Sequence, residues 1–250
     1  MAIIIKSAKE LETMREAGRI VAETLALLAR KVRPGVSTAE LDELAYRHVK
    51  KRGAKPSFKG YRGFPASLCV SINEEVVHGV PSPERVLREG DIVSLDFGDI
   101  YQGFQGDAAI TVPVGKVSPL AEELIQVTEA ALMEGISHAR AGNHLSDVSS
   151  AIQTYAEARG LSVVRQYVGH GIGREMHEDP QVPNFGPPGM GPLLRPGMTL
   201  ALEPMVNVGT WRTVVKEDKW TVVTEDGSLS AHFEHTIAVT TGEPEILTRL

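Results

Sequence analysis

The sequence has little that would tie it to an oxidising compartment or a membrane. It contains one cysteine, Cys69, so no internal disulfide can form. No run approaches the roughly 18 apolar residues of a membrane span. Residues 1–6 lack the basic segment and long apolar run of a signal peptide. By elimination we expect a cytoplasmic location and no membrane partner.

Basic charge and common catalytic motifs are also lacking. The net charge of −6 argues against dedicated nucleic-acid binding, which usually requires a basic excess. The zinc motif HExxH, the nucleophile elbow GxSxG and the phosphate loop GxxxxGK[ST] do not occur. Cys69 lies among apolar neighbours without an activating base, which argues against a thiol nucleophile.

The chain contains one internal repeat. LREGDIVSLD at 87–96 is similar to LRPGMTLALE at 194–203, an offset of 107 residues. Two shorter matches, at 33–35 with 140–142 and at 52–53 with 159–160, have the same offset. We therefore predict an ancient duplication, with halves at about 7–114 and 115–250 in a single catalytic domain spanning 1–250.

Each half begins with helix signals and continues with strand-like stretches. Ser7 with Glu10 and Ser37 with Glu40 form capping boxes, and Ser118 precedes a proline at the favoured first helical position. The four predicted helices end near Pro34-Gly35, Gly53, Gly142 and Gly160. The predicted strands are 67–72, 92–97 and 108–114, then 199–208, 220–224 and 232–239. Helix pairs followed by antiparallel strands indicate an α+β fold.

Acidic residues interrupt four of these apolar strand patterns. Asp96 and Glu203 occupy equivalent positions in the repeat. Asp107 begins the next strand, and a hairpin centred on 101–103 would place it opposite Asp96. Glu234 lies in another apolar strand after the turn at 225–227. Burying unpaired carboxylates costs several kcal/mol each, so four acids without a nearby buried cation predict a metal site.

The histidines and one basic cluster are the remaining candidates for chemistry. His170 and His177 flank a glycine-bearing stretch, and His78 lies in VVHGVP. One such histidine alone would be read as structural, but three beside four strand-borne acids favour a site. Carboxylate-rich sites with few imidazoles suit Mn, Fe, Co or Zn. The basic cluster at 50–62 is either a solvated face or a docking surface for RNA.

These residues resemble those of the methionine aminopeptidases over essentially the whole chain. The strings that carry the resemblance are NEEVVHGVP at 73–81, SLDFG at 94–98, GHGIGREMHE at 169–178, ALEPM at 201–205 and FEHTIAVT at 233–240. The resemblance implies the pita-bread fold, which has two pseudo-symmetric halves. Glu234 follows Glu203 by only 31 positions, which leaves no room for the insert of type II enzymes, so the chain is similar to bacterial type I members.

The resemblance also implies roles for individual residues. It implies two divalent ions held by five ligands, Asp96, Asp107, His170, Glu203 and Glu234. Asp107 and Glu234 would bridge both ions, Asp96 would hold one, and His170 with Glu203 the other. His78 and His177 would contact the substrate, and Glu203 would also move protons. The implied methionine pocket consists of Phe58, Tyr61, Phe64, Cys69, Met176 and Trp220.

The implied activity is removal of the initiator methionine from nascent chains whose second residue is small. Two alternatives share the fold. One is a proline-directed aminopeptidase or prolidase, and the other is a non-catalytic protein that binds RNA or ribosomes and would have lost ligands. We expect a monomer, because no apolar excess is evident. The nascent polypeptide, and through cluster 50–62 the ribosome, are the expected partners.

Overall fold

The helices begin where their capping residues predict. A computed structural model describes residues 2–250. Ser7 and Ser37 each accept a hydrogen bond from a backbone N–H of the first turn, while Glu10 and Glu40 bond back to the cap, so both capping boxes are formed. Ser118 caps a third helix that has proline in its first turn. The helices are α1 (Ala8–Ala29), α2 (Thr38–Lys51), α3 (Pro119–His138), α4 (Leu145–Glu157) and the short η1 (Tyr61–Gly63).

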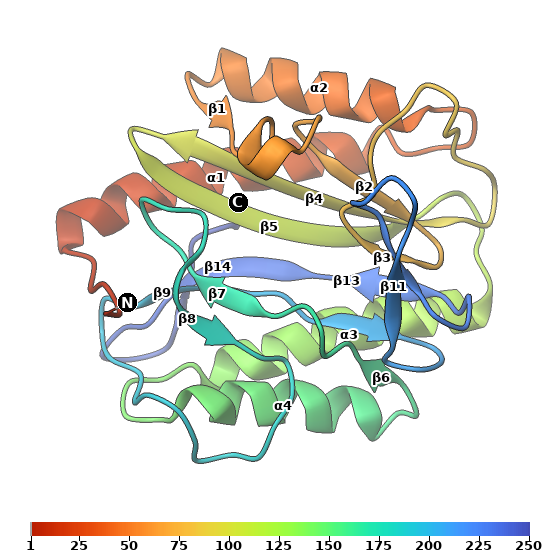
Figure 1. Cartoon of the computed structure of the whole chain (residues 1–250). Helices are drawn as coiled ribbons and strands as arrows, with labels where there is room; N and C mark the ends of the chain where they lie inside the picture. The colour runs from red at the N-terminus through yellow and green to blue at the C-terminus, as the bar shows by residue number, and fades with distance from the viewer. Residues whose placement is uncertain (1) are drawn as a thin grey trace.

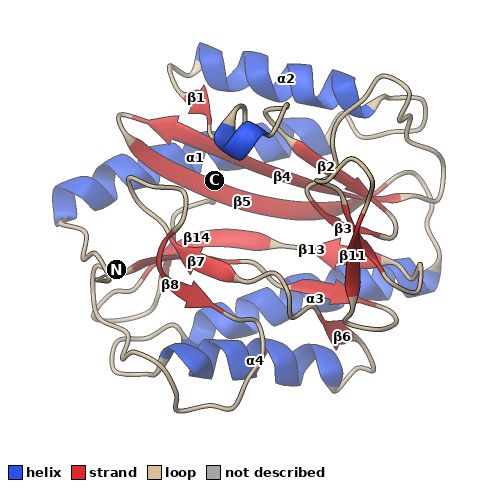
Figure 2. Cartoon of the chain, viewed as in Figure 1, coloured by secondary structure: helices blue, strands red, loops and turns tan. Residues whose placement is uncertain are grey.

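One large antiparallel sheet forms the centre of the molecule (Figures 1 and 2). Its strands follow the order β1-β4-β5-β14-β9-β7-β8, with β2 paired to β4 and β15 to β14. They are β1 (Lys55–Pro56), β2 (Cys69–Ile72), β4 (Ile92–Tyr101), β5 (Phe104–Pro113), β7 (Gly169–Gly171), β8 (Glu178–Val182), β9 (Thr199–Leu202), β14 (Glu234–Ala238) and β15 (Glu245–Ile246). Helices and antiparallel strands together confirm the predicted α+β fold.

Two small sheets lie beside the large one. The first has the order β13-β10-β6 and the second β11-β12-β3. Their strands are β3 (Glu75–Val77), β6 (Ser162–Val163), β10 (Met205–Asn207), β11 (Thr213–Val215), β12 (Val222–Thr224) and β13 (Ser230–His232). Two predicted strands are therefore each divided. The stretch 199–208 breaks after Leu202, where Pro204 lacks the N–H that a ladder requires, and 232–239 breaks at Phe233. The predicted strand 220–224 begins only at Val222.

The helices cover one face of the large sheet and leave the other face for the polar residues. Val93, Leu95 and Phe97 of β4 pack into a buried cluster with α1 and α2. Leu200 and Ile237, on β9 and β14, pack into a second cluster with α3 and α4. Since side chains alternate along a strand, residues between these apolar positions point away from the helices. None of the helices in residues 2–250 combines the length and hydrophobicity that a membrane span requires.

Candidate active site

The first two acids project from the β4–β5 hairpin, on the face opposite α1. The ladder pairs Asp96 with Ala109 and Asp107 with Gly98, so the two acids are diagonal neighbours two positions apart. The prediction that they lie directly opposite was wrong. The turn is the two-residue Gln102-Gly103, both at positive φ, which joins Tyr101 to Phe104 and shifts the register by one residue on each strand. Both acids remain on one face because the offset is even.

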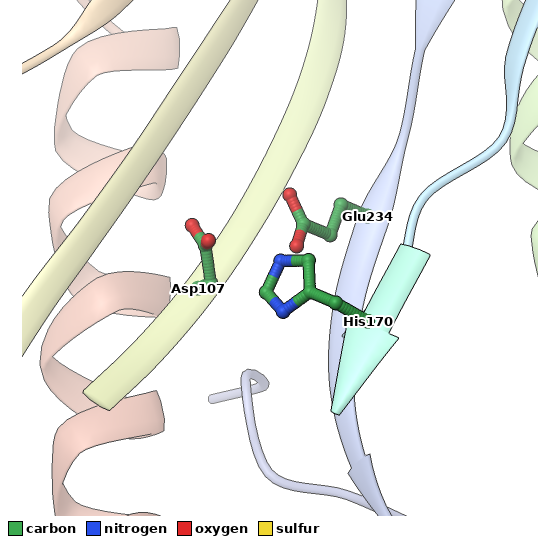
Figure 3. A group of neighbouring side chains, drawn as sticks. All are labelled: Asp107, His170 and Glu234. Carbon is green, nitrogen blue, oxygen red and sulfur yellow. The ribbon is translucent and has the colours of Figure 1, made fainter. Parts of the chain in front are cut away.

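The other two acids come from the second half of the chain. Glu234 begins β14, whereas Glu203 lies just beyond the end of β9 and not within a strand as predicted. His170 is the middle residue of β7 and pairs with Ala201 in the ladder. In Figure 3 the side chains of Asp107, His170 and Glu234 point toward one another from β5, β7 and β14. One ligand atom from each of these three lies within 4.8 Å of the others.

These acids are buried without enough partners. Asp107 is 4 % and Glu234 3 % exposed. One oxygen each of Asp96, Asp107 and Glu234 has no hydrogen-bond partner among the described residues. Burial raises the pKa of Asp96 to about 7. Burial, with repulsion from the neighbouring acids, raises the pKa values of Asp107, Glu203 and Glu234 well above their usual range.

The donor set fits divalent cations. Orphaned, buried carboxylate oxygens that repel one another are the arrangement that a shared cation stabilises. Burial lowers the pKa of His170 to about 3, so its imidazole is neutral and able to act as a ligand. The His170 Nε2 atom lies 3.6 Å from Glu203 Oε1, a spacing that two ligands of one ion can have. Oxygen donors with one imidazole suit hard or borderline divalent metals.

Two further histidines border this group. Burial lowers the pKa of His78 to about 4. The His78 backbone has φ 59°, and its ring stands edge-on to Tyr167 at 5.8 Å between centroids. His177 lies with its ring centroid 4.3 Å from that of His170, and its Nδ1 is 2.8 Å from the Tyr61 hydroxyl. Burial, aided by the nearby Arg62 cation, lowers the pKa of His177. Both rings are therefore neutral hydrogen-bonding groups at neutral pH.

The four acids and the three histidines His78, His170 and His177 line a single cavity of about 180 Å³. Its acidic and imidazole groups meet a mainly apolar wall that includes the edge-on pair Phe64 and Trp220. Every residue predicted from the sequence for the site lines this cavity, and Arg62 joins them. The lining residues are Phe58, Tyr61, Arg62, Phe64, Cys69, His78, Asp96, Asp107, His170, Met176, His177, Glu203, Trp220 and Glu234.

The sequence reasoning missed one residue of this region. His232 is 2 % exposed, and neither ring nitrogen has a hydrogen-bond partner among residues 2–250. Its Nε2 lies 3.9 Å from Glu203 Oε2 and 4.0 Å from Glu234 Oε2. A signal was available, because His232 stands two positions before Glu234, a spacing that favours the same face of a strand.

Comparison with known proteins places the chain among metal-dependent peptidases. Residues 12–241 match the model of metallopeptidase family M24. A methionine aminopeptidase from Clostridium acetobutylicum is 58% identical over 246 residues, which cover 98% of each chain. Methionine aminopeptidase 1 from Bacillus subtilis is 55% identical over 248 residues, covering 99% of this chain and 100% of that one.

A solved structure agrees in fold. The crystal structure of a methionine aminopeptidase from Thermotoga maritima superposes with a TM-score of 0.98 at 51% sequence identity, covering 100% of both chains. A match over the full length leaves no element of the sheet or of the helix layer outside the comparison.

Proposed function

Because this chain belongs to metallopeptidase family M24, we propose that it is an aminopeptidase that removes the initiator methionine from nascent polypeptides whose second residue is small. The observation that carries this proposal is the single cavity in which four buried acids and three histidines adjoin a mainly apolar wall. The full-length relatives at 55–58% identity support the same activity.

The acids and His170 are the proposed ligands of two ions. Asp107 and Glu234 would be shared by both ions, and each has an oxygen without a hydrogen-bond partner among the described residues. Asp96 would help to hold one ion, and His170 with Glu203 would help to hold the other. When bound, the ions supply Lewis-acid activation of a water molecule and of the scissile carbonyl. Co, Mn, Fe and Zn all suit this donor set.

The chain's own groups orient the substrate and move protons. Glu203 accepts the proton of the attacking water and delivers it to the leaving amine. His177, fixed by Tyr61 at Nδ1, donates from Nε2 to the carbonyl oxygen as negative charge develops there. His78 contacts the nitrogen of the scissile bond.

The apolar wall selects the first residue. Phe58, Tyr61, Phe64, Cys69, Met176 and Trp220 surround a space suited to an unbranched thioether. The metal site closes one side of the cavity, so a large second residue would collide with its walls. Pocket contacts of this kind discriminate by about 10- to 200-fold per branch or methylene.

The proposal also covers where the protein acts and what it docks to. The protein acts as a monomer in the cytoplasm, where nascent chains emerge. Lys50, Lys51, Lys55 and Lys59 are exposed on the segment that leads to the cavity residue Arg62. This cluster at 50–62 offers a docking surface for the ribosome, and it reaches the cavity at Arg62.

Peptide hydrolysis tests the function directly. We expect rapid cleavage of Met-Ala and Met-Gly peptides, slow cleavage of Met-Lys and Met-Phe peptides, and loss of all cleavage with a chelator. Leu-Ala peptides should be cleaved about 10- to 200-fold more slowly than Met-Ala. Equal rates on Met-Ala and Leu-Ala would indicate a broad aminopeptidase. Cleavage of Xaa-Pro bonds in preference to Met-Ala would favour the proline-directed alternative, and no cleavage with any metal would favour a binding protein.

A further inference from the structure

A buried ion pair connects the first residues of the chain to the segment that carries His177. The Lys6 Nζ atom lies 2.5 Å from Glu178 Oε2, and the two side chains are only 3% and 5% exposed. The Lys6 backbone N–H donates to the carbonyl of Gly197, just before β9. Figure 1 shows the start of the chain running beside β9. Lys6 is thus held in place by a backbone hydrogen bond and by a side-chain ion pair.

The other oxygen of Glu178 holds the preceding loop. Oε1 accepts a hydrogen bond from the backbone N–H of Arg174 at 2.9 Å and a longer one from Glu175 at 3.4 Å. Gly173 is required beside them, because an added Cβ would lie 2.4 Å from Lys6 Cε and 2.5 Å from Glu178 Oε1. The Glu178 carboxylate therefore holds both ends of the loop 172–177 together and also forms the ion pair with Lys6.

This loop places two residues of the proposed active site. Met176 is 3% exposed and forms part of the apolar wall, and His177 is the proposed oxyanion donor. Both lie between the Glu178 carboxylate and the N–H groups that it binds. We propose that Lys6 is a positioning residue, which acts through Glu178 to set the loop 172–177 and so the aim of His177. This inference rests on the proposed function for its kinetic consequence only.

The physical reason is charge neutralisation. A carboxylate this deeply buried needs a cationic partner or it draws in water and moves. If Lys6 loses its charge, Glu178 has to reach solvent or reorganise, and it then releases the N–H groups of Arg174 and Glu175. The ligand strand β7 keeps its ladder to β9, so His170 and the acids should stay in place. The expected defect is thus in the geometry of catalysis and not in metal binding.

Three variants distinguish the effect of the Lys6 charge from the effect of its side-chain size. Lys6→Met keeps most of the side-chain length and leaves Glu178 unpaired. Lys6→Met/Glu178→Gln removes both charges but keeps an amide oxygen to accept the loop N–H groups. Lys9→Met is the matched control, because Lys9 is an exposed lysine in the first turn of α1. Each is measured for kcat and KM on a Met-Ala peptide, for Mn²⁺ affinity by calorimetry, and for hydrogen exchange of residues 172–178.

We expect Lys6→Met to lower kcat by about 100-fold, the scale of a displacement of roughly 1 Å at a catalytic group, with a smaller change in KM. Hydrogen exchange in 172–178 should quicken while Mn²⁺ affinity is unchanged. The double variant should regain on the order of tenfold, and Lys9→Met should match the parent protein. If Lys6→Met is too unstable to purify, the double variant alone should still fold, protect the loop and turn over.

Two outcomes would overturn the inference. In one, Lys6→Met keeps the parent kcat and the parent exchange in 172–178. In the other, the double variant is as impaired as the single one, which would trace the loss to the shape of the lysine and not to its charge. Failure of the parent protein to cleave any Met peptide would instead refute the proposed function, while the exchange data would still decide whether Lys6 sets the loop.

Discussion

At the residue scale, the informative feature is a set of carboxylates on strand positions that face away from the helices. Asp96 and Asp107 could be predicted as site residues, because a carboxylate in an apolar strand pattern is costly to bury unless it has a cationic partner. His232 was not, because its neighbours Ala231 and Phe233 make it resemble an ordinary core histidine. A linear sequence does not reveal that Glu203 and Glu234 approach it from two different elements.

The first residue-scale prediction concerns the bridging ligands. Asp107→Asn and Glu234→Gln should each lose at least one ion per chain and lower kcat/KM by more than about 100-fold, because even outer partners of metal ligands typically cost 10- to 100-fold. Metal content by elemental analysis and peptide hydrolysis provide the measurements.

A matched control lies on the same hairpin. Asp99 is fully buried, but it does not line the cavity. Asp99→Asn removes a buried carboxyl from the opposite face and should retain the full metal content. Equal metal loss in Asp99→Asn and Asp107→Asn would show that the loss reflects general damage to the hairpin.

A second prediction separates chemistry from metal binding. His177→Ala should lower kcat by about 100-fold or more, the usual effect of removing one oxyanion donor, and should keep the parent metal content. Calorimetry on the metal-free protein checks the binding. If the variant fails to bind one of the ions, His177 belongs to the ligand set and its proposed role is wrong.

At the element scale, helix starts were predictable and strand ends were not. Capping boxes are local, so Ser7 and Ser37 mark α1 and α2 without tertiary information. The register of β4 with β5 depends on which two residues form the turn, and several polar residues near 101–103 could have served. The division of 199–208 into β9 and β10 was signalled by Pro204, which the apolar pattern around it obscured.

The hairpin itself supports a prediction about its two faces. A Cβ added at Gly98 would lie 3.1 Å from Met176 Cε, 3.1 Å from Phe58 Cε1 and 3.2 Å from Asp107 Oδ1, where the apolar wall meets the acids. A Cβ added at Gly106 would lie 3.0 Å from backbone atoms of Ala17 and Gly18 in α1. Gly98→Ala should therefore raise KM for Met-Ala peptides with little loss of stability. Gly106→Ala should cost about 1–3 kcal/mol of stability and leave KM unchanged. A KM effect at Gly106 with a stability loss at Gly98 would show that the two faces of the hairpin are assigned the wrong way round.

At the whole-molecule scale, the fold holds several carboxylates close together although they repel one another. The acids come from both halves of the sheet, so the cost of bringing them together is offset by the burial of apolar side chains against both helix pairs. Stability of the protein should consequently depend on protons and on metal together, and the two should oppose each other.

The final prediction follows from the direction of the pKa shifts. Folding raises the pKa of Asp96 to about 7 and those of Asp107, Glu203 and Glu234 well above their usual range. In the unfolded chain these acids are ionised above pH 6.5, so the folded, metal-free protein binds more protons than the unfolded one. Its stability should therefore fall as the pH rises from 7.5 to 8.5.

The pH window lies above the range in which the histidines contribute. Folding lowers the pKa of His78 to about 4 and of His170 to about 3, and it also lowers the pKa values of His177, His232 and His235. Unfolded imidazoles have a pKa of about 6.5, so this cost in stability is largely gone above about pH 7.5. Urea unfolding of chelator-treated protein at pH 7.5 and 8.5 measures the slope.

Mn²⁺ at 100 times its dissociation constant should add about 2.7 kcal/mol. At a fixed Mn²⁺ concentration the gain should be greater at pH 8.5, because the ligands must release protons to bind. Burial also raises the pKa of Asp99, but this residue does not line the cavity. The contribution of Asp99 to the pH dependence of stability should therefore remain when metal is bound. Metal-free stability that rises from pH 7.5 to 8.5, or a metal gain that is larger at pH 7.5, would contradict a site built from repelling buried carboxylates.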